Sequence, residues 1–209
     1  MAKDGDTEKR ILDAARAVFI RRGTAGARMQ EIAEEAGVNQ ALLHYYFRSK
    51  ERLSEAVFSE IAGRMFPAVI AILGGDFTID EKIDRFVDAY LENMSRSPFL
   101  PGYLLSELHH HPERIPRLIG SVTGKSLSAA LAPALEKLDK QLASEARKGH
   151  VRRIGAQQFV VNLLSLCVFP FAARPMFRAA FDMDDDDFAK LISARRKELP
   201  QFIRNALRP

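Results

Sequence analysis

Residues 29–53 decide the fold of this chain and read MQEIAEEAGVNQALLHYYFRSKERL. The first eight of them predict a short amphipathic helix, over about Met29 to Ala36, whose inner face carries Ile32, Ala33 and Ala36. Gly37 supplies the left-handed backbone conformation that commonly ends a helix. Asn39 can cap the next helix, which reaches Tyr46 or Phe47. Two short helices joined by a tight turn are typical of a helix-turn-helix.

The residues at the turn and on the second helix fit that motif. The close helix crossing needs a small residue, the turn a residue that tolerates positive φ, and the turn also needs an apolar anchor. These requirements are met in order by Ala33, Gly37 and Val38. Leu43 and Phe47 lie four residues apart and face inward, so the outward face carries Gln40, Ala41, His44 and Tyr45. Glutamine can pair with adenine edges and small side chains can contact thymine, so this face suits the DNA major groove.

Basic residues follow the second helix directly, at Arg48, Lys50 and Arg52. Ser49 can cap a further helix that begins there, which places Lys50 in its first turn. Backbone N–H groups at a helix start point in the same direction as such a lysine, and together they can hold a phosphate. These contacts would fix the position of the protein on DNA without reading its sequence.

The whole run closely resembles the signature of the TetR/AcrR family of transcriptional regulators, specifically over about residues 7–60. The matching residues are Ile32-Ala33, Ala36-Gly37-Val38, Leu43, Phe47 and Lys50-Glu51-Arg52-Leu53. The resemblance implies that base and phosphate contacts come from Gln40, Ala41, His44, Tyr45 and Tyr46, and a phosphate contact from Lys50.

The chain departs from the family pattern at three positions. The family often has threonine in place of Arg28, tyrosine in place of His44 and histidine in place of Tyr46. Arg28 can still reach a phosphate, so we retain it among the expected DNA contacts. His44 can donate to a phosphate or a base edge, or it can have a structural role.

The remainder of the chain predicts an all-α protein of about nine helices, because apolar residues recur at spacings of three and four. Thr7 can cap a first helix, which stops at Gly23. Gly63 and Pro67 should bend or interrupt the fourth helix, which runs toward Leu73. We therefore expect a DNA-binding domain over residues 7–67, with its helix-turn-helix at about 28–47, and a larger helical domain over 68–209. Further helices are expected at about Ile79–Ser95, Tyr103–His110, Ile115–Lys148 (broken or kinked near Gly120, Gly124 and Pro133), Ala156–Phe171 and Asp186–Leu207.

The family resemblance implies that the larger domain dimerises and encloses an effector pocket. The expected homodimer helices are those at about 156–171 and 186–207, and the first is apolar on more than one face. A dimer would also let two recognition helices read a pseudo-palindromic operator. Aromatic and thioether side chains suggest an apolar or aromatic small-molecule effector, although each could equally belong to the core. The expected effector contacts are Phe66, Phe86, Tyr90, Met94, Tyr103, His109 and Phe169.

Three other features could carry chemistry, but each has an ordinary structural explanation. His109-His110-His111 cannot all bind one ion from a regular helix, because adjacent side chains point in different directions. Asp184 to Asp187 form a run typical of a solvated helix start. Cys167 lies in an apolar stretch, so it is expected to be buried rather than to act as a redox sensor. No catalytic pairing or phosphate-binding glycine loop is present, so we expect no enzyme activity, no cofactor and no metal.

Composition is compatible with this interpretation. The chain has 209 residues, 47% of them hydrophobic, and a formal net charge of +4. No signal peptide is evident at the N-terminus, and the apolar runs look too short or too interrupted to span a bilayer, so we expect a cytoplasmic protein. The resulting hypothesis is a dimeric repressor that a small effector releases from operator DNA. An effector-independent regulator or an activator is the alternative, and a metal-binding helical protein or enzyme is a remote one.

Overall fold

The computed structural model describes residues 2–97 and 99–209, which form eleven helices and no strand. This confirms the expected all-α class. The helices are α1 (Ala2–Gly26), α2 (Met29–Ala36), α3 (Gln40–Phe47), α4 (Lys50–Gly74), α5 (Ile79–Arg96), α6 (Leu100–His110), α7 (Arg114–Thr123), α8 (Leu127–Arg147), α9 (Ala156–Ala172), α10 (Arg174–Ala180) and α11 (Asp185–Ala206).

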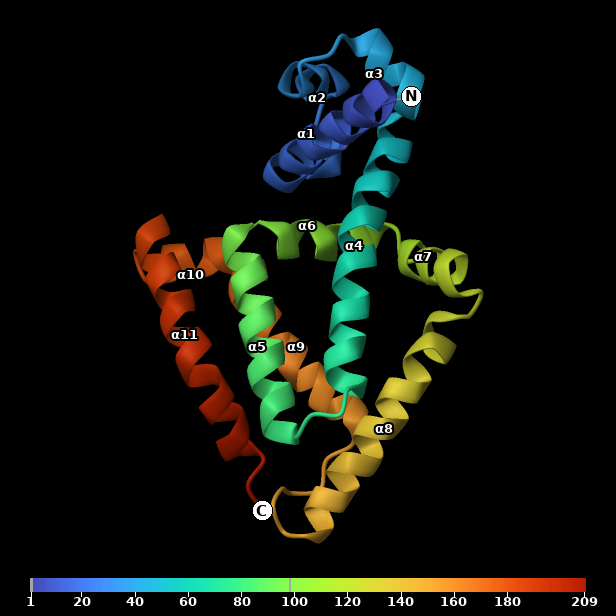
Figure 1. Ribbon diagram of the computed structural model, residues 1–209. Coiled ribbons are helices and arrows are strands. Elements are labelled where there is room, and N and C mark those ends of the chain that lie inside the picture. Colours follow the sequence, from blue (N-terminus) through green and yellow to red (C-terminus); the bar gives the residue numbers. More distant parts are fainter. Residues whose placement is uncertain (1, 98) are drawn as a thin grey trace.

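The helices form two units that α4 connects (Figure 1). The first three helices and the N-terminal half of α4 make a small head. The C-terminal half of α4 lies among α5, α8 and α9 in the larger unit, while α6 and α7 lie between the two. The described part of α4 runs unbroken through Gly63 and Pro67, so the expected interruption there is wrong.

Two predicted helix boundaries also need correction. Helix α1 begins at Ala2 rather than at Thr7, so Thr7 lies inside it and does not cap it. Its regular part does break at Gly23, the expected end, where φ is 69° and ψ is 164°. The long helix expected after residue 115 is divided at Gly124, which has a φ of 66° and separates α7 from α8. Positive φ strains any residue with a side chain, so glycine ends the helix there.

Two apolar cores hold these units together. The first unites α1 to α4 and also receives side chains from α6 and α7, including Tyr103, Leu104 and Ile115. The second lies between the end of α4, α5, α8, α9 and α11, and Phe86, Leu91 and Phe159 are at most 2% exposed in it. The head is therefore joined to the larger unit by a shared core as well as by α4.

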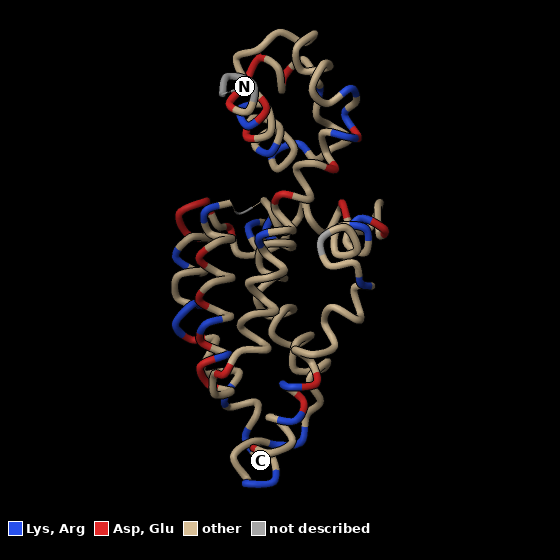
Figure 2. The backbone as a smooth tube through the Cα atoms, turned by 45° about the vertical axis from the view of Figure 1, so that its right-hand side comes forward, with Lys and Arg blue, Asp and Glu red and all other residues tan. Residues whose placement is uncertain are grey.

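A ladder of ion pairs joins α11 to α5 along the outside of the second core. Figure 2 shows basic and acidic positions alternating along the backbone on this side of the larger unit. Arg196 contacts Asp88 at 2.5 Å and Glu92 at 2.6 Å. About two helical turns further along α11, Arg204 contacts Asp84, and it contacts Asp80 at 3.3 Å. The ladder helps to fix the register of α11 on α5, while Asp185 at the start of α11 pairs with Arg174 and Arg178 of α10.

By length and hydropathy alone, α4 could cross a bilayer, and the bent pair α9 and α10 could make a second such segment. The expectation that every apolar run is too short or too interrupted is therefore wrong for α4, whose glycine and proline do not break it. Its apolar side chains Leu53, Val57, Phe58 and Ala62 are at most 1% exposed in the first core. Core helices of this kind commonly satisfy the same length and hydropathy criteria.

Candidate DNA-binding site and effector cavity

The turn between α2 and α3 has the geometry that its sequence predicts. Gly37 adopts the left-handed conformation, with φ 64° and ψ 36°, and the backbone N–H of Val38 donates to the Ala33 carbonyl at 3.0 Å. The Asn39 side chain accepts the Leu42 backbone N–H at 2.7 Å and so caps α3. Both helices keep the predicted bounds because the glycine that ends α2 and the asparagine that starts α3 are separated by one residue.

Helix α3 has one buried face and one open face. Leu43 is fully buried and Phe47 is 8% exposed, which anchors the helix on the head. Gln40, Ala41 and His44 are exposed, and Tyr45 is 75% exposed. These four side chains, all expected DNA contacts, therefore share an accessible surface. Tyr46 is half-buried and lies edge-on to Tyr45, with 5.4 Å between ring centroids.

The two other expected phosphate contacts, Arg28 and Lys50, lie near each other at the segment between α1 and α2, and Lys50 has a second role. Arg28 is exposed and extended just before α2. Lys50, at the start of α4, donates from Nζ to the carbonyl oxygens of Ala25 and Ala27, each at 3.3 Å. Lys50 thus ties the start of α4 to the segment between α1 and α2, while Ser49 caps α4 by accepting the Arg52 N–H at 3.3 Å.

One residue that stabilises the reading surface is not evident from the helix-turn-helix motif itself. Arg10 of α1 donates to the carbonyl oxygens of Ala36 at 2.6 Å and Gly37 at 3.1 Å. The positive guanidinium also interacts favourably with the negative, C-terminal end of the α2 dipole. The sequence shows only a basic residue at position 10. Its carbonyl acceptors become evident only when the crossing of α1 and α2 is known.

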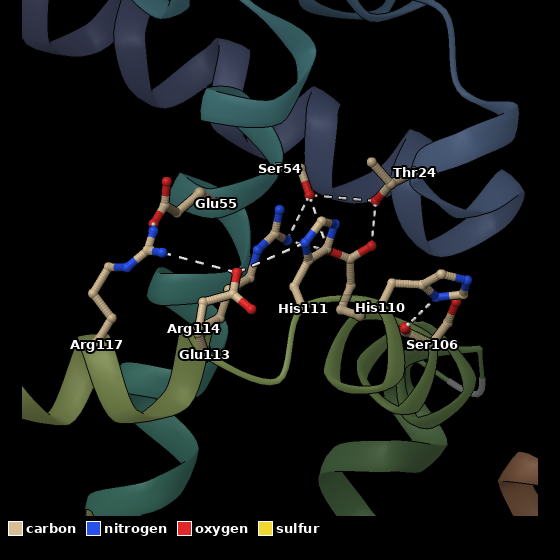
Figure 3. A network of polar contacts seen from close by, with 10 residues as sticks. Thr24, Ser54, Glu55, Ser106, His110, His111, Glu113, Arg114 and Arg117 are labelled. Atoms are coloured by element: carbon tan, nitrogen blue, oxygen red, sulfur yellow. Dashed lines mark hydrogen bonds and ion pairs between the residues drawn. The ribbon is translucent and has the colours of Figure 1, made fainter. Parts of the chain in front are cut away.

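A buried polar cluster connects the head to the larger unit. It consists of Thr24 of α1, Ser54 of α4, Glu107 of α6 and Arg114 of α7, and Figure 3 shows the labelled members pointing toward one another. The Glu107 carboxylate accepts hydrogen bonds from Thr24 at 2.6 Å, from Ser54 at 3.1 Å and from Arg114. Arg114 also donates to the Ser54 hydroxyl at 3.0 Å. Buried charges are tolerated when paired and hydrogen-bonded in this way.

The expected effector contact Tyr103 lies beside that cluster and not in a cavity. Its ring stacks on Phe19 at 6.4 Å between centroids, and it is 4% exposed. Burial, together with the Glu107 carboxylate, raises the pKa of Tyr103 to about 12. Tyr103 therefore packs at the junction between the two units.

A cavity of about 640 Å³ lies between α1, α4 and α5. It is lined by three of the expected effector contacts, Phe86, Tyr90 and Met94. The other four do not line it: Phe66 packs on the first core, Tyr103 lies at the junction, and His109 and Phe169 are exposed. The sequence could not distinguish these sets, because a helical cavity depends on how the helices cross. Arg16, Arg64 and Arg96 also line the cavity and were not expected there.

The other chemically suggestive residues have structural contacts. Asp184 caps α11 by accepting the Asp187 N–H at 2.8 Å, which confirms the expected helix start. His110 Nδ1 lies 2.7 Å from the Ser106 carbonyl oxygen on its own helix. Cys167 is fully buried, and burial raises its pKa to about 12. Within residues 2–97 and 99–209, no group of three His, Cys, Asp or Glu side chains could hold a metal ion.

Comparisons with known proteins agree with this geometry. Residues 11–57 match the family described as bacterial regulatory proteins, tetR family. The HTH-type transcriptional repressor SCO4008 of Streptomyces coelicolor is 35% identical over 112 residues, which are 52% of this chain and 57% of that protein. The HTH-type transcriptional regulator BetI of Rhizobium meliloti is 35% identical over 79 residues, 38% of this chain and 39% of that one. The chain thus spans about half the length of these relatives.

Solved structures share the fold over nearly the whole chain. A HlyIIR mutant protein has a TM-score of 0.63 at 22% identity, covering 99% of this chain and 97% of that one. FadR from Bacillus subtilis, in complex with stearoyl-CoA, has a TM-score of 0.59 at 18% identity, covering 91% and 96%. The named relatives are HTH-type transcriptional regulators. The helix-turn-helix over residues 11–57 therefore matches the tetR family of bacterial regulatory proteins, and the chain as a whole is similar in fold to solved members of this group of regulators.

Proposed function

We propose that this chain represses transcription by binding operator DNA with α3 in the major groove. The observation that carries the proposal is the accessible face of α3, where Gln40, Ala41, His44 and Tyr45 lie together while Leu43 and Phe47 anchor the helix. An exposed amide with small and aromatic neighbours can contact base edges, and Arg28 and Lys50, which meet near Ala27, can hold phosphates. The partner is chromosomal DNA, so the site of action is the cytoplasm.

Binding occurs as a homodimer through α9 and α11. On α9, Val161 is 54% and Phe169 is 55% exposed, and on α11 Phe202 is 59% exposed. Large exposed apolar side chains on neighbouring helices support a protein interface, and a second copy is the partner that a two-fold DNA site requires. Each α3 would then read one half of a pseudo-palindrome.

The cavity between α1, α4 and α5 holds a small effector that releases the DNA. Its apolar walls support an apolar or aromatic ligand, and FadR from Bacillus subtilis is a protein of this fold with stearoyl-CoA bound. An effector-independent regulator or an activator remains the second candidate function, since the same α3 surface would serve it equally well.

Footprinting on the DNA upstream of the protein's own gene tests the proposal. Protection of an inverted repeat, with half-sites about 10 base pairs or a multiple apart, is the expected result. Loss of protection with the variant Tyr45→Ala would tie the footprint to α3, because Tyr45 is the most open large side chain there. Protection without sequence selectivity would overturn the assignment of α3 as a reading helix.

A further inference from the structure

The cavity between α1, α4 and α5 has an apolar interior. Phe86 is 1% and Met94 is 4% exposed, and both form part of its wall together with Met65, Val69 and Ile72 of α4. A volume of about 640 Å³ falls within the range of cavities that hold small organic molecules. Its inner part is therefore suited to a hydrocarbon chain or a ring system.

The Tyr90 hydroxyl adds a polar atom to this apolar wall. Tyr90 stacks on Phe86 with 6.0 Å between ring centroids and lines the cavity. Within the described residues, no hydrogen bond is present for its hydroxyl group. Burial raises the pKa of Tyr90, so the group is a neutral hydroxyl that can donate one hydrogen bond to a bound molecule.

The rim of the cavity carries an excess of positive charge. Arg16 of α1, Arg64 of α4 and Arg96 of α5 line it, and Glu60 is the carboxylate that lines it with them. Each arginine pairs with an acid three or four residues earlier on its own helix: Arg16 with Asp13, Arg64 with Glu60 and Arg96 with Glu92, at 3.0, 2.7 and 2.6 Å. The Arg64 and Arg96 side chains are each 73% exposed. Ion pairs this exposed are weak, so an incoming anion can replace the intrahelical acid.

We propose that the cavity binds an amphipathic anion, with its apolar body against Phe86 and Met94 and its carboxylate, sulfonate or phosphate among Arg16, Arg64 and Arg96. A guanidinium presents two parallel N–H donors to such a group. This inference rests on the proposed function, because it names the chemical class of the effector. It adds a charged head to the apolar ligand that the sequence suggested.

The position of the cavity gives the bound anion a route to the DNA-binding head. Arg16 and Ile20 belong to α1, which packs against α2 of the helix-turn-helix, whereas Phe86 and Arg96 belong to α5 of the larger unit. A molecule that contacts residues of both α1 and α5 joins the head to the larger unit directly. Its binding therefore favours one orientation of the head over others.

Two fluorescent probes of matched shape test the charge preference on the full chain without DNA. Anilinonaphthalene sulfonate carries an anionic group, and N-phenylnaphthylamine is the same ring system without it. Replacing Arg64→Gln together with Arg96→Gln should raise the Kd of the sulfonate about tenfold and change that of the neutral probe by less than about twofold. Arg85→Gln is the matched control, because Arg85 is an exposed arginine of α5 that stacks on Phe77 at 4.1 Å, away from the cavity.

A second variant locates the bound probe. Ala68 lines the cavity from α4, whereas Ala71 is exposed on the same helix and does not line it. Ala68→Trp should weaken binding of both probes, and Ala71→Trp should leave both unchanged. Equal effects of the arginine variants on the two probes would overturn the anionic class, and equal effects of the two tryptophan variants would overturn the site. A failure of operator binding would contradict the proposed function and leave these probe results unaffected.

Discussion

The Glu107 carboxylate and the Arg114 guanidinium form an ion pair in which the two side chains are 5% and 6% exposed. The pair lies where α6 and α7 meet the head, and Thr24 and Ser54 of the head complete its hydrogen bonds. The orientation of the DNA-binding head is therefore fixed partly by a charge pair that is almost fully buried. Such a pair is costly to break from one side, since the remaining charge stays buried.

Replacing Glu107→Gln should lower the free energy of unfolding by roughly 3 kcal/mol, because Arg114 is left buried without its counter-ion. Urea denaturation followed by circular dichroism measures the change. The matched control is Glu113→Gln, a carboxylate that is 51% exposed and pairs with Arg117 at 3.8 Å. This control substitution should lower the free energy of unfolding by less than about 1 kcal/mol. Equal losses in the two variants would show that burial of the pair does not matter.

Replacing Gln40→Ala should reduce discrimination at one base pair of each half-site by about 1–3 kcal/mol and leave binding to unrelated DNA almost unchanged. The reason is that the exposed amide reads a base edge and contributes little to the phosphate contacts. Competition binding with single-base operator variants measures the effect. Gln30→Ala is the control, since Gln30 is an exposed glutamine of α2 that bonds to Glu34. Unchanged discrimination at every position would contradict the role of Gln40.

Replacing Lys50→Ala should weaken binding to all DNA sequences and reduce the slope of log K against log salt by about 0.9, the loss of one phosphate contact. The hydrogen bonds from Lys50 to Ala25 and Ala27 imply some loss of stability as well, so the comparison is made well below the unfolding temperature. Lys140→Ala, an exposed lysine of α8, should leave the slope unchanged. A lower affinity with an unchanged slope would mean that Lys50 acts only by positioning the head.

Replacing Val161→Arg should convert the protein to a folded monomer, because it places a charge on the exposed apolar face of α9 that we assign to the dimer. Sedimentation velocity measures the oligomeric state, and circular dichroism checks the fold. Leu105→Arg is the control, since Leu105 is 47% exposed on α6, outside that face. A dimer that survives the α9 substitution and dissociates with the α6 substitution would place the interface elsewhere.

Cys167 should not react with a thiol reagent in the folded protein at pH 8. Burial raises its pKa to about 12, so the reactive thiolate is scarce at that pH, and the side chain is also inaccessible. Labelling should become rapid after unfolding in guanidinium chloride. The rate of thiol labelling is measured from the absorbance change after addition of a disulfide reagent. Fast stoichiometric labelling of the native protein would mean that Cys167 is an accessible, reactive group.

Much of the head could be predicted because its signals are local. Gly37 and Asn39 fix the end of α2 and the start of α3 within three residues of each other, and the structure agrees with both predictions. The predicted start of α1 at Thr7 was wrong. A good capping residue does not mark the first turn of a helix when the residues before it can also be helical, and α1 begins at Ala2. Helix α10 was missed because only a short break at Ala173 separates it from α9.

The candidate sites were predictable to different degrees for the same reason. The open face of α3 follows from helical periodicity once Leu43 and Phe47 are placed inside. The cavity depends on the crossing of α1, α4 and α5, so aromatic residues such as Phe66 and Phe86 looked equivalent in the sequence but are not equivalent in the structure. The arginines at its rim were likewise hidden, because each looked like one half of an ordinary ion pair on a helix surface.

Selection of binding sites from a random double-stranded DNA pool tests the central claim, that α3 reads a specific sequence, most directly. The wild-type chain should enrich an inverted repeat with half-sites about one helical turn, or a multiple of it, apart. Enrichment of a single half-site or of no sequence at all would contradict the account of a dimer that reads DNA with α3.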